Sequence, residues 1–143
     1  MRRTRLFGAG SVALALTAVV LLAQAQHGGG AIFVASKTAD FTQRMPGASM
    51  HFIWGDTLAG PFGGFTKFKP GFDAGMHTHT NDVLLVVIRG AYLYRDEAGE
   101  KRVGPGDFIR IPGGHKHWSG GDGKEGALFY QETFGKFDLI PSK

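Results

Sequence analysis

The sequence of 143 residues contains no cysteine. Disulfides and a lipid-modified cysteine are therefore excluded, and the folded domain must be stabilised by its core alone. The sequence also lacks a phosphate-binding loop, a nucleotide-binding fingerprint and the Ser-His-Asp order of hydrolases. No long stretch shows the periodicity of an amphipathic helix. These absences exclude several common enzyme classes and direct attention to short β-prone segments and to the histidines.

The N-terminus has the three parts of a secretory signal peptide. Arg2, Arg3 and Arg5 form a positive start, residues 6–22 are largely apolar, and Ala23-Gln24-Ala25 is a small-x-small cleavage site. We predict that residues 1–25 are a signal peptide and that cleavage exports a chain of 118 residues to the periplasm or the medium. The alternative is an uncleaved membrane anchor, because the apolar run is nearly long enough to span a bilayer.

The basic balance of the chain is largely a property of this leader. The whole sequence has 16 basic and 12 acidic residues, and removing the three N-terminal arginines leaves 13 basic residues. The remaining lysines and arginines are scattered among apolar and acidic residues, whereas a nucleic-acid-binding surface needs them clustered. We therefore expect no nucleic-acid partner, and no membrane association after cleavage.

Residues 26–40 are predicted to be a flexible leader, and residues 41–143 a single domain. Short β-prone runs alternate there with Gly, Pro and Asp, a pattern that favours an all-β sandwich or barrel. The aliphatic run 82–89 suggests a strand buried on both faces or at a barrel corner. The segment 91–95 is expected to pair back on it across Gly90, and the glycine-rich segment 119–124 is expected to be a loop. Further strands are expected at 50–54, 64–69, 107–111 and 127–133.

Three histidines are the strongest candidates for a functional site. His77 and His79 lie two residues apart, so in a strand both side chains point to the same face. His117 follows the sharp Pro112-Gly113-Gly114 turn and must approach from another strand or loop. Three imidazoles can hold a transition metal and leave coordination positions open for chemistry. Taken alone, however, a His-x-His pair is more often an ordinary surface feature.

The two histidine segments resemble the two sequence motifs of the cupin family. The first motif is Gly, five residues, His-x-His, three or four residues, Glu, six residues and Gly; it is matched by Gly71, His77, His79 and Gly90. The second is Gly, five residues, Pro-x-Gly, two residues, His, three residues and Asn; it is matched by Gly106, Pro112, Gly114 and His117. The resemblance implies a double-stranded β-helix, a jelly-roll-like barrel with a metal held inside by the three histidines.

The sequence departs from the cupin pattern at two positions. Val83 stands where the first motif has its glutamate, and Gly121 replaces the final asparagine. Without the glutamate, three neutral imidazoles leave the full charge of a divalent ion uncompensated. We therefore expect a divalent transition metal, namely zinc, copper or nickel, with iron also open. Residues considered as replacements for the glutamate, without ranking, are His51, Tyr130, Gln131 and Glu132.

The resemblance implies either of two functions. The first is a metal-dependent enzyme, dioxygenase-like or a Lewis-acid isomerase or lyase, acting on a small, partly apolar molecule. The second is a non-catalytic periplasmic module that binds a metal or a small ligand. Tyr130 is the one candidate for a catalytic acid or base. His115 is interpreted as a residue of the rim or of the second coordination shell. Cupins often form dimers, so a homodimer is one possible assembly.

Overall fold

The computed structural model describes residues 30–55 and 60–143, and the regular secondary structure in this part of the chain consists of β-strands. The predicted signal peptide lies outside the described residues, as does the start of the predicted leader. In the described ranges no helix is long and apolar enough to cross a membrane. The strands are β1 (Thr42–Met45), β2 (Ala48–Gly55), β3 (Phe62–Phe68), β4 (Asp73–Thr78), β5 (Val83–Gly90), β6 (Tyr92–Asp96), β7 (Gly99–Val103), β8 (Phe108–Ile111), β9 (His117–Gly121), β10 (Ala127–Thr133) and β11 (Ile140–Pro141).

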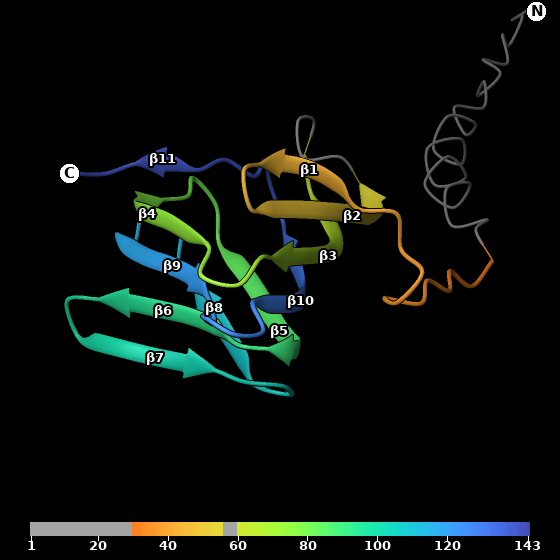
Figure 1. The fold of residues 1–143 in the computed structure, drawn as a ribbon. Helices are drawn as coiled ribbons and strands as arrows, with labels where there is room; N and C mark the ends of the chain where they lie inside the picture. The colour runs from red at the N-terminus through yellow and green to blue at the C-terminus, as the bar shows by residue number, and fades with distance from the viewer. Residues whose placement is uncertain (1–29, 56–59) are drawn as a thin grey trace, which may run out of the picture. The chain divides into compact units, whose positions relative to one another are not determined.

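Residues 33–143 form one unit in which the strands make two antiparallel sheets. The six-stranded sheet has the order β1-β2-β3-β10-β5-β8, and the five-stranded sheet has the order β11-β4-β9-β6-β7 (Figure 1). Aromatic side chains join the sheets, because the ring of Tyr92 on β6 stacks on Phe68 of β3 and meets Phe129 of β10 edge-on. The predicted all-β fold is confirmed.

Alternation along the central strands places the core between the two sheets. On β10, Phe129 and Gln131 face inward and are 0% and 4% exposed, whereas Tyr130 between them is only half-buried. The aliphatic strand β5 alternates in the same way, with Val86 37% and Ile88 41% exposed. The prediction that this strand is buried on both faces is therefore wrong, because nothing in the described residues covers its outer face.

The expected pairing of residues 91–95 with the preceding aliphatic strand is also wrong. β5 pairs with β10 and β8, whereas β6 lies in the other sheet and pairs with β7 and β9. Gly90 separates the two strands and has a φ of 70°, which a residue with a side chain rarely adopts. The glycine therefore marks the point where the chain crosses between sheets, and not a hairpin turn.

The glycine-rich segment 119–124 is only partly a loop. Ser119, Gly120 and Gly121 belong to β9, are buried, and pair with β6. A Cβ atom on Gly120 would lie 2.6 Å from the carbonyl oxygen of Phe72, so this glycine allows close packing of neighbouring backbones. The loop begins at Asp122. The carboxylate of Asp122 accepts hydrogen bonds from the backbone amides of Lys124 and Glu125.

Candidate metal centre

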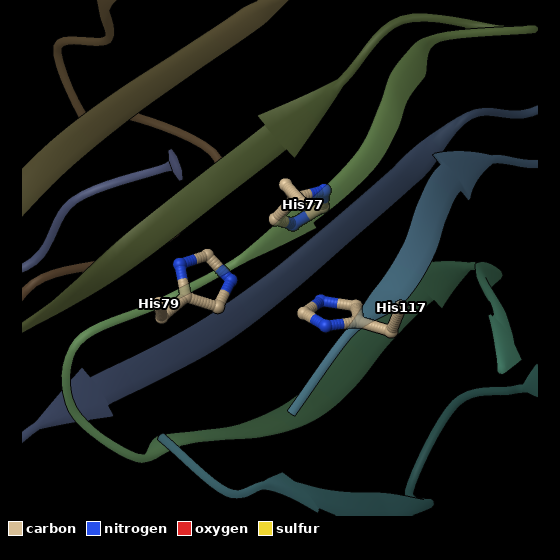
Figure 2. A group of neighbouring side chains, drawn as sticks. All are labelled: His77, His79 and His117. Atoms are coloured by element: carbon tan, nitrogen blue, oxygen red, sulfur yellow. The ribbon is translucent and has the colours of Figure 1, made fainter. Parts of the chain in front are cut away.

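The five-stranded sheet brings the three predicted histidines together on its inner face. His77 lies near the end of β4, His79 directly follows that strand, and His117 opens β9. His77 and His117 are register partners in the β4–β9 pair. The centroid of the His77 ring lies 4.9 Å from that of His79 and 4.3 Å from that of His117, and the last two are 5.3 Å apart (Figure 2). The side chains therefore form one cluster from segments 38 residues apart in sequence.

Backbone carbonyl groups fix the orientation of all three rings. The Nδ1 atom of His77 lies 2.8 Å from the oxygen of Gly75, and that of His117 lies 3.0 Å from the oxygen of His115. The Nδ1 atom of His79 lies 2.5 Å from the oxygen of Asp138. A carbonyl oxygen can only accept, so each Nδ1 carries the proton and each Nε2 keeps a free lone pair. This is the arrangement that metal-ligating histidines adopt.

Local irregularities of the backbone supply these acceptors. β4 contains a register shift between Asp73 and Met76, and Gly75 within it has a φ of 71°. The bulge leaves the Gly75 carbonyl outside the regular ladder and free to accept from His77. The Asp138 carbonyl is held beside His79 because the Asp138 carboxylate accepts hydrogen bonds from the amide and hydroxyl of Thr80, at 2.8 and 2.7 Å. Neither acceptor has a signature in the sequence.

The burial and the protonation state of the three histidines suit the binding of a cation. His77, His79 and His117 are 1%, 5% and 0% exposed, and burial lowers the pKa of each imidazole below its usual value. All three rings are therefore neutral at physiological pH. One nitrogen from each lies within 4.8 Å of the others, and the buried Nε2 of His117 has no hydrogen-bond partner among the described residues. This donor set fits a transition metal, which takes neutral imidazole nitrogens as ligands.

A partly enclosed cavity of about 110 Å³ lies between the sheets, next to the cluster. His77 and His79 form part of its wall, and Val83 lines it as well, so the residue at the motif's glutamate position does face the cavity. No aspartate or glutamate is among the described residues that line it, and Arg44 is the charged residue there. An ion held by the histidines would therefore have no carboxylate from this wall beside it.

Tyr130, the candidate for a catalytic acid or base, does not lie beside the histidines. It is absent from the described cavity wall, and its ring meets Phe65 edge-on. Its hydroxyl accepts a hydrogen bond from Nε1 of Trp54 at 3.1 Å and donates one to the Glu132 carboxylate at 3.2 Å. Glu132 shares this outward face because side chains alternate along β10. Tyr130 and Glu132 therefore serve a hydrogen-bond network outside the barrel.

Of the four residues considered as replacements for the missing glutamate, Gln131 is the one that lines the cavity. His51 is instead hydrogen-bonded through Nδ1 to the backbone oxygen of Asp40, at 2.9 Å. Alternation along the strand already predicted that Gln131 lies on a different face from Tyr130 and Glu132, because residues 127, 129, 131 and 133 of one strand must share a face. Choosing which face points inward required the sheet arrangement.

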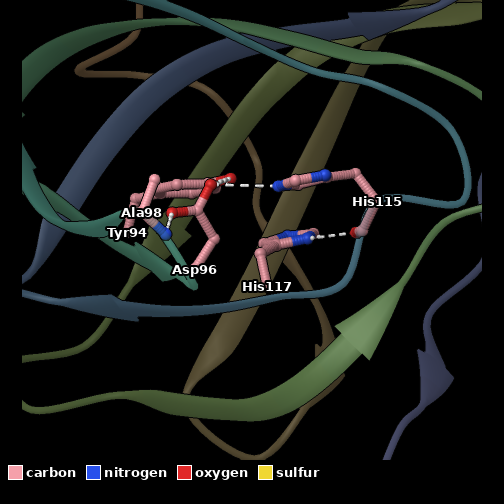
Figure 3. Close-up of polar contacts among 5 residues, drawn as sticks. All are labelled: Tyr94, Asp96, Ala98, His115 and His117. Atoms are coloured by element: carbon pink, nitrogen blue, oxygen red, sulfur yellow. Dashed lines mark hydrogen bonds and ion pairs between the residues drawn. The ribbon is translucent and has the colours of Figure 1, made fainter.

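His115 faces away from the cluster but contributes through its backbone. Its Nε2 lies 3.0 Å from the Asp96 carboxylate, which also accepts a hydrogen bond from the Tyr94 hydroxyl at 2.8 Å (Figure 3). These contacts, that of His115 first, lower the pKa of Asp96 to about 2. The ring of Tyr94 is stacked on His117, with centroids 5.5 Å apart. Sequence reasoning missed this packing residue and its partner Asp96.

Comparison with known proteins supports the same fold. The family model described as "Cupin domain" matches residues 64–130, and the comparison with curated proteins found no match. KdgF from Halomonas sp. is 20% identical, with a TM-score of 0.58, covering 71% of this chain and 93% of that one. The polyketide cyclase RemF from Streptomyces resistomycificus is 18% identical, with a TM-score of 0.65 and coverage of 78% and 84%.

A third similar structure is described as DMSP lyases RdDddP and RnDddQII. It is 19% identical, with a TM-score of 0.56, and the match covers 67% of this chain and 53% of that one. At these identities the likeness concerns the fold, two antiparallel sheets closed around a cavity. Together with the family match, the fold and the convergent histidines, it confirms the predicted resemblance. The chain has the cupin fold and carries a single cupin domain, which the family model matches over residues 64–130.

Proposed function

We propose that this protein is an exported, metal-dependent cupin enzyme in which His77, His79 and His117 hold one divalent transition metal. Zinc, copper, nickel and iron are the candidates, because three neutral imidazoles without a carboxylate suit metals of this borderline class. The observation that carries the proposal is the hydrogen bonding of the three Nδ1 atoms to backbone carbonyls, which leaves three Nε2 lone pairs on one buried surface. An ordinary core histidine needs no such arrangement.

The metal would supply Lewis acidity or a place for dioxygen beside a bound substrate. The chain's own residues orient the three imidazoles, keep them neutral by burial and partly enclose the cavity. Its aromatic wall, which includes Phe68, Phe72 and Phe129, suits a partly apolar molecule. A cavity of about 150 Å³ binds benzene in another protein, so a cavity of about 110 Å³ encloses a part of a ligand that is smaller than benzene.

The activities named for similar structures favour an enzyme over a passive binder. A polyketide cyclase and DMSP lyases are among them. The reaction type proposed for this chain is accordingly dioxygenase-like or a Lewis-acid isomerisation or elimination. The fold alone does not choose among these, because cupin-like barrels host many activities.

One observation favours the second candidate, a non-catalytic module that binds a metal or a small ligand. Apart from the histidines, the titratable lining residues in the described part of the chain are Arg44 and Tyr92. Burial raises the pKa of Tyr92 to about 12, which makes its hydroxyl a poor proton donor at neutral pH. A binding module needs no acid or base, and such a lining would suffice for it.

Two measurements on the purified mature domain separate the candidates. Metal content is determined first by mass spectrometry, and one equivalent of zinc, copper, nickel or iron is expected. Oxygen uptake and product formation are then screened with diketones, catechols, thiols and compounds prone to elimination. Turnover that is lost on chelation supports the enzyme. Tight metal binding without any oxidative or eliminative turnover would favour the module, and stoichiometric manganese would contradict the charge argument.

Export to the periplasm or the medium is the remaining part of the proposal. It rests on the positive start, apolar run and Ala23-Gln24-Ala25 site. N-terminal sequencing of protein recovered from the cell envelope or the medium should begin at Gln26. A first residue of Met1 or Arg2 in a membrane fraction would instead indicate an uncleaved anchor.

A further inference from the structure

The wall of the cavity formed by the six-stranded sheet carries two polar side chains that the proposed metal site does not use. Gln131 on β10 and Thr66 on β3 both line the cavity and are 4% and 3% exposed. The Nε2 atom of Gln131 and the Oγ1 atom of Thr66 are buried without a hydrogen-bond partner among the residues that the structure describes. Buried polar groups of folded proteins nearly always have a partner, so each unmet group needs an explanation.

The sheet register places these two side chains side by side. Thr66 is the partner of Phe129, and Gln131 lies two residues further along the same face of β10. Diagonal neighbours of this kind are about 7–8 Å apart at their backbones, within reach of a long side chain. The residue directly opposite Gln131 is Gly64, which puts no side chain between the amide and the cavity. One small ligand group can therefore meet both polar atoms.

The charges around the cavity indicate the sign of the ligand. The described lining contains no carboxylate, and Arg44 adds a positive charge at its exposed edge. A divalent cation on the histidines would make the site more positive still. An anionic ligand is favoured in such a site, and a cationic one is opposed.

We propose that Gln131 and Thr66 recognise an oxygen acceptor of the substrate, and that the substrate is a small carboxylic acid with a keto or hydroxyl oxygen a few carbons from the carboxylate. This inference rests on the proposed function, because it assumes that the metal is bound on the histidine wall, the side of the cavity that carries His77 and His79. One oxygen group of the ligand would meet the histidine wall and the other the Gln131 amide. The carbon chain between them packs against aromatic residues such as Phe68 and Phe129.

The first test needs neither metal nor ligand. Gln131→Met keeps the length of the side chain and removes the unmet amide, so the melting temperature of the metal-free domain should rise by roughly 3–6 °C. Such a gain in stability at the expense of binding is typical of residues kept for function. Gln43→Met, on the exposed face of β1, is the control and should leave the melting temperature unchanged. An unchanged or lower melting temperature for Gln131→Met would show that the amide is structural and would overturn the proposal.

The second test uses two acids that differ by one oxygen. The cobalt(II)-loaded domain is titrated with levulinate (4-oxopentanoate) and with pentanoate, and the visible cobalt spectrum is followed. Levulinate should bind at least about tenfold more tightly, because a polar site discriminates strongly against a ligand that leaves it unpaired. In Gln131→Met and in Thr66→Val this preference should fall, to about twofold or less in the former, while the affinity for pentanoate stays the same.

The outcomes separate this inference from the metal-site proposal. If cobalt binds but the wild-type domain does not distinguish the two acids, or if Gln131→Met retains the preference, the role of Gln131 is wrong and the metal site stands. If cobalt does not bind to the wild-type domain at all, the metal site is wrong and the substrate assignment falls with it.

Discussion

The polar side chains on the two sheets that enclose the cavity differ in their hydrogen bonding. On the five-stranded sheet, each of the three imidazoles has its Nδ1 atom engaged by a backbone carbonyl. On the six-stranded sheet, Gln131 and Thr66 carry polar atoms that have no partner among the described residues. On the first wall the ring orientations are fixed before any ligand arrives, and the Nε2 of His117 is left open for a metal. On the second wall an amide and a hydroxyl group are left open for a polar ligand.

This difference reflects two ways in which a small barrel can prepare a site. Orienting a ligand nitrogen through its other ring nitrogen stabilises the folded protein and the metal complex together. Leaving an amide unpaired destabilises the free protein and stabilises only the bound state. Gln131→Met should therefore stabilise the metal-free domain, and the following experiments probe the wall that is prepared for the metal.

The largest effect is expected from the histidine wall itself. His79→Ala should reduce metal retention at least about a hundredfold, because two imidazoles alone seldom hold a divalent ion against dialysis. His115→Ala should retain most of the metal, because His115 supports His117 through its backbone oxygen and not through its ring. Metal content after exhaustive dialysis measures both. Equal losses would show that the ligands are wrongly assigned.

A smaller loss is expected when the support of His79 is weakened. Asp138→Ala removes the carboxylate that binds Thr80 and holds the Asp138 carbonyl beside the His79 ring. Loss of such an outer support typically lowers metal affinity 10–100-fold, and we expect about tenfold here. Asp107→Ala is the control, because Asp107 caps the Gly104 amide in a distant turn. Competition with a chromophoric chelator gives both affinities, and equal values would remove the role assigned to Asp138.

A carboxylate introduced on the six-stranded sheet should change the relative affinity of the site for different metals. Val83→Glu places an acid on the lining beside His77 and His79, so the relative affinity for iron or manganese over zinc should rise several-fold. Leu84→Glu, on the outward face of the same strand, is the control. Metal competition followed by mass spectrometry measures the shift. An unchanged profile in Val83→Glu would mean that this position does not reach the ion.

The smallest effect is expected in the pH dependence of the stability of the metal-free domain. Burial lowers the pKa of all three clustered histidines, so the unfolded chain binds more protons than the folded one below about pH 6.5. The metal-free domain should therefore lose stability as the pH falls from about 7.5 to about 5.5, and should be most stable above this window. Urea denaturation across the pH range measures this. In the triple variant His77→Gln, His79→Gln and His117→Gln the dependence should flatten, whereas an equally steep profile would locate its origin elsewhere.

The sequence predicted the parts of this protein that depend on spacing and alternation. The convergence of His77, His79 and His117 was anticipated from the motif register, and the strand at 127–133 was placed within its observed bounds. The strand at 82–89 was also located, but the solvent exposure of its outer face was not predicted. Residues carry the information for a strand locally, while the cover on its two faces depends on segments that arrive from elsewhere.

The remaining errors have a common physical origin in long-range geometry. The step at Gly90 between sheets is a choice of partner strand, which local sequence does not encode. Tyr130 and Gln131 are adjacent, and only the sheet arrangement determines which of them faces the cavity. The acceptor for His79 is a backbone oxygen 59 residues away, and a carbonyl group has no side-chain signature.

The most direct test of the account is a crystal structure of the mature domain grown with one equivalent of cobalt(II), with anomalous data collected at the cobalt edge. The account predicts a single strong anomalous peak about 2.0–2.2 Å from the Nε2 atoms of His77, His79 and His117, with each Nδ1 still bonded to its carbonyl. An ion bound at any other group of residues, or three histidine rings that remain without metal under these conditions, would contradict it.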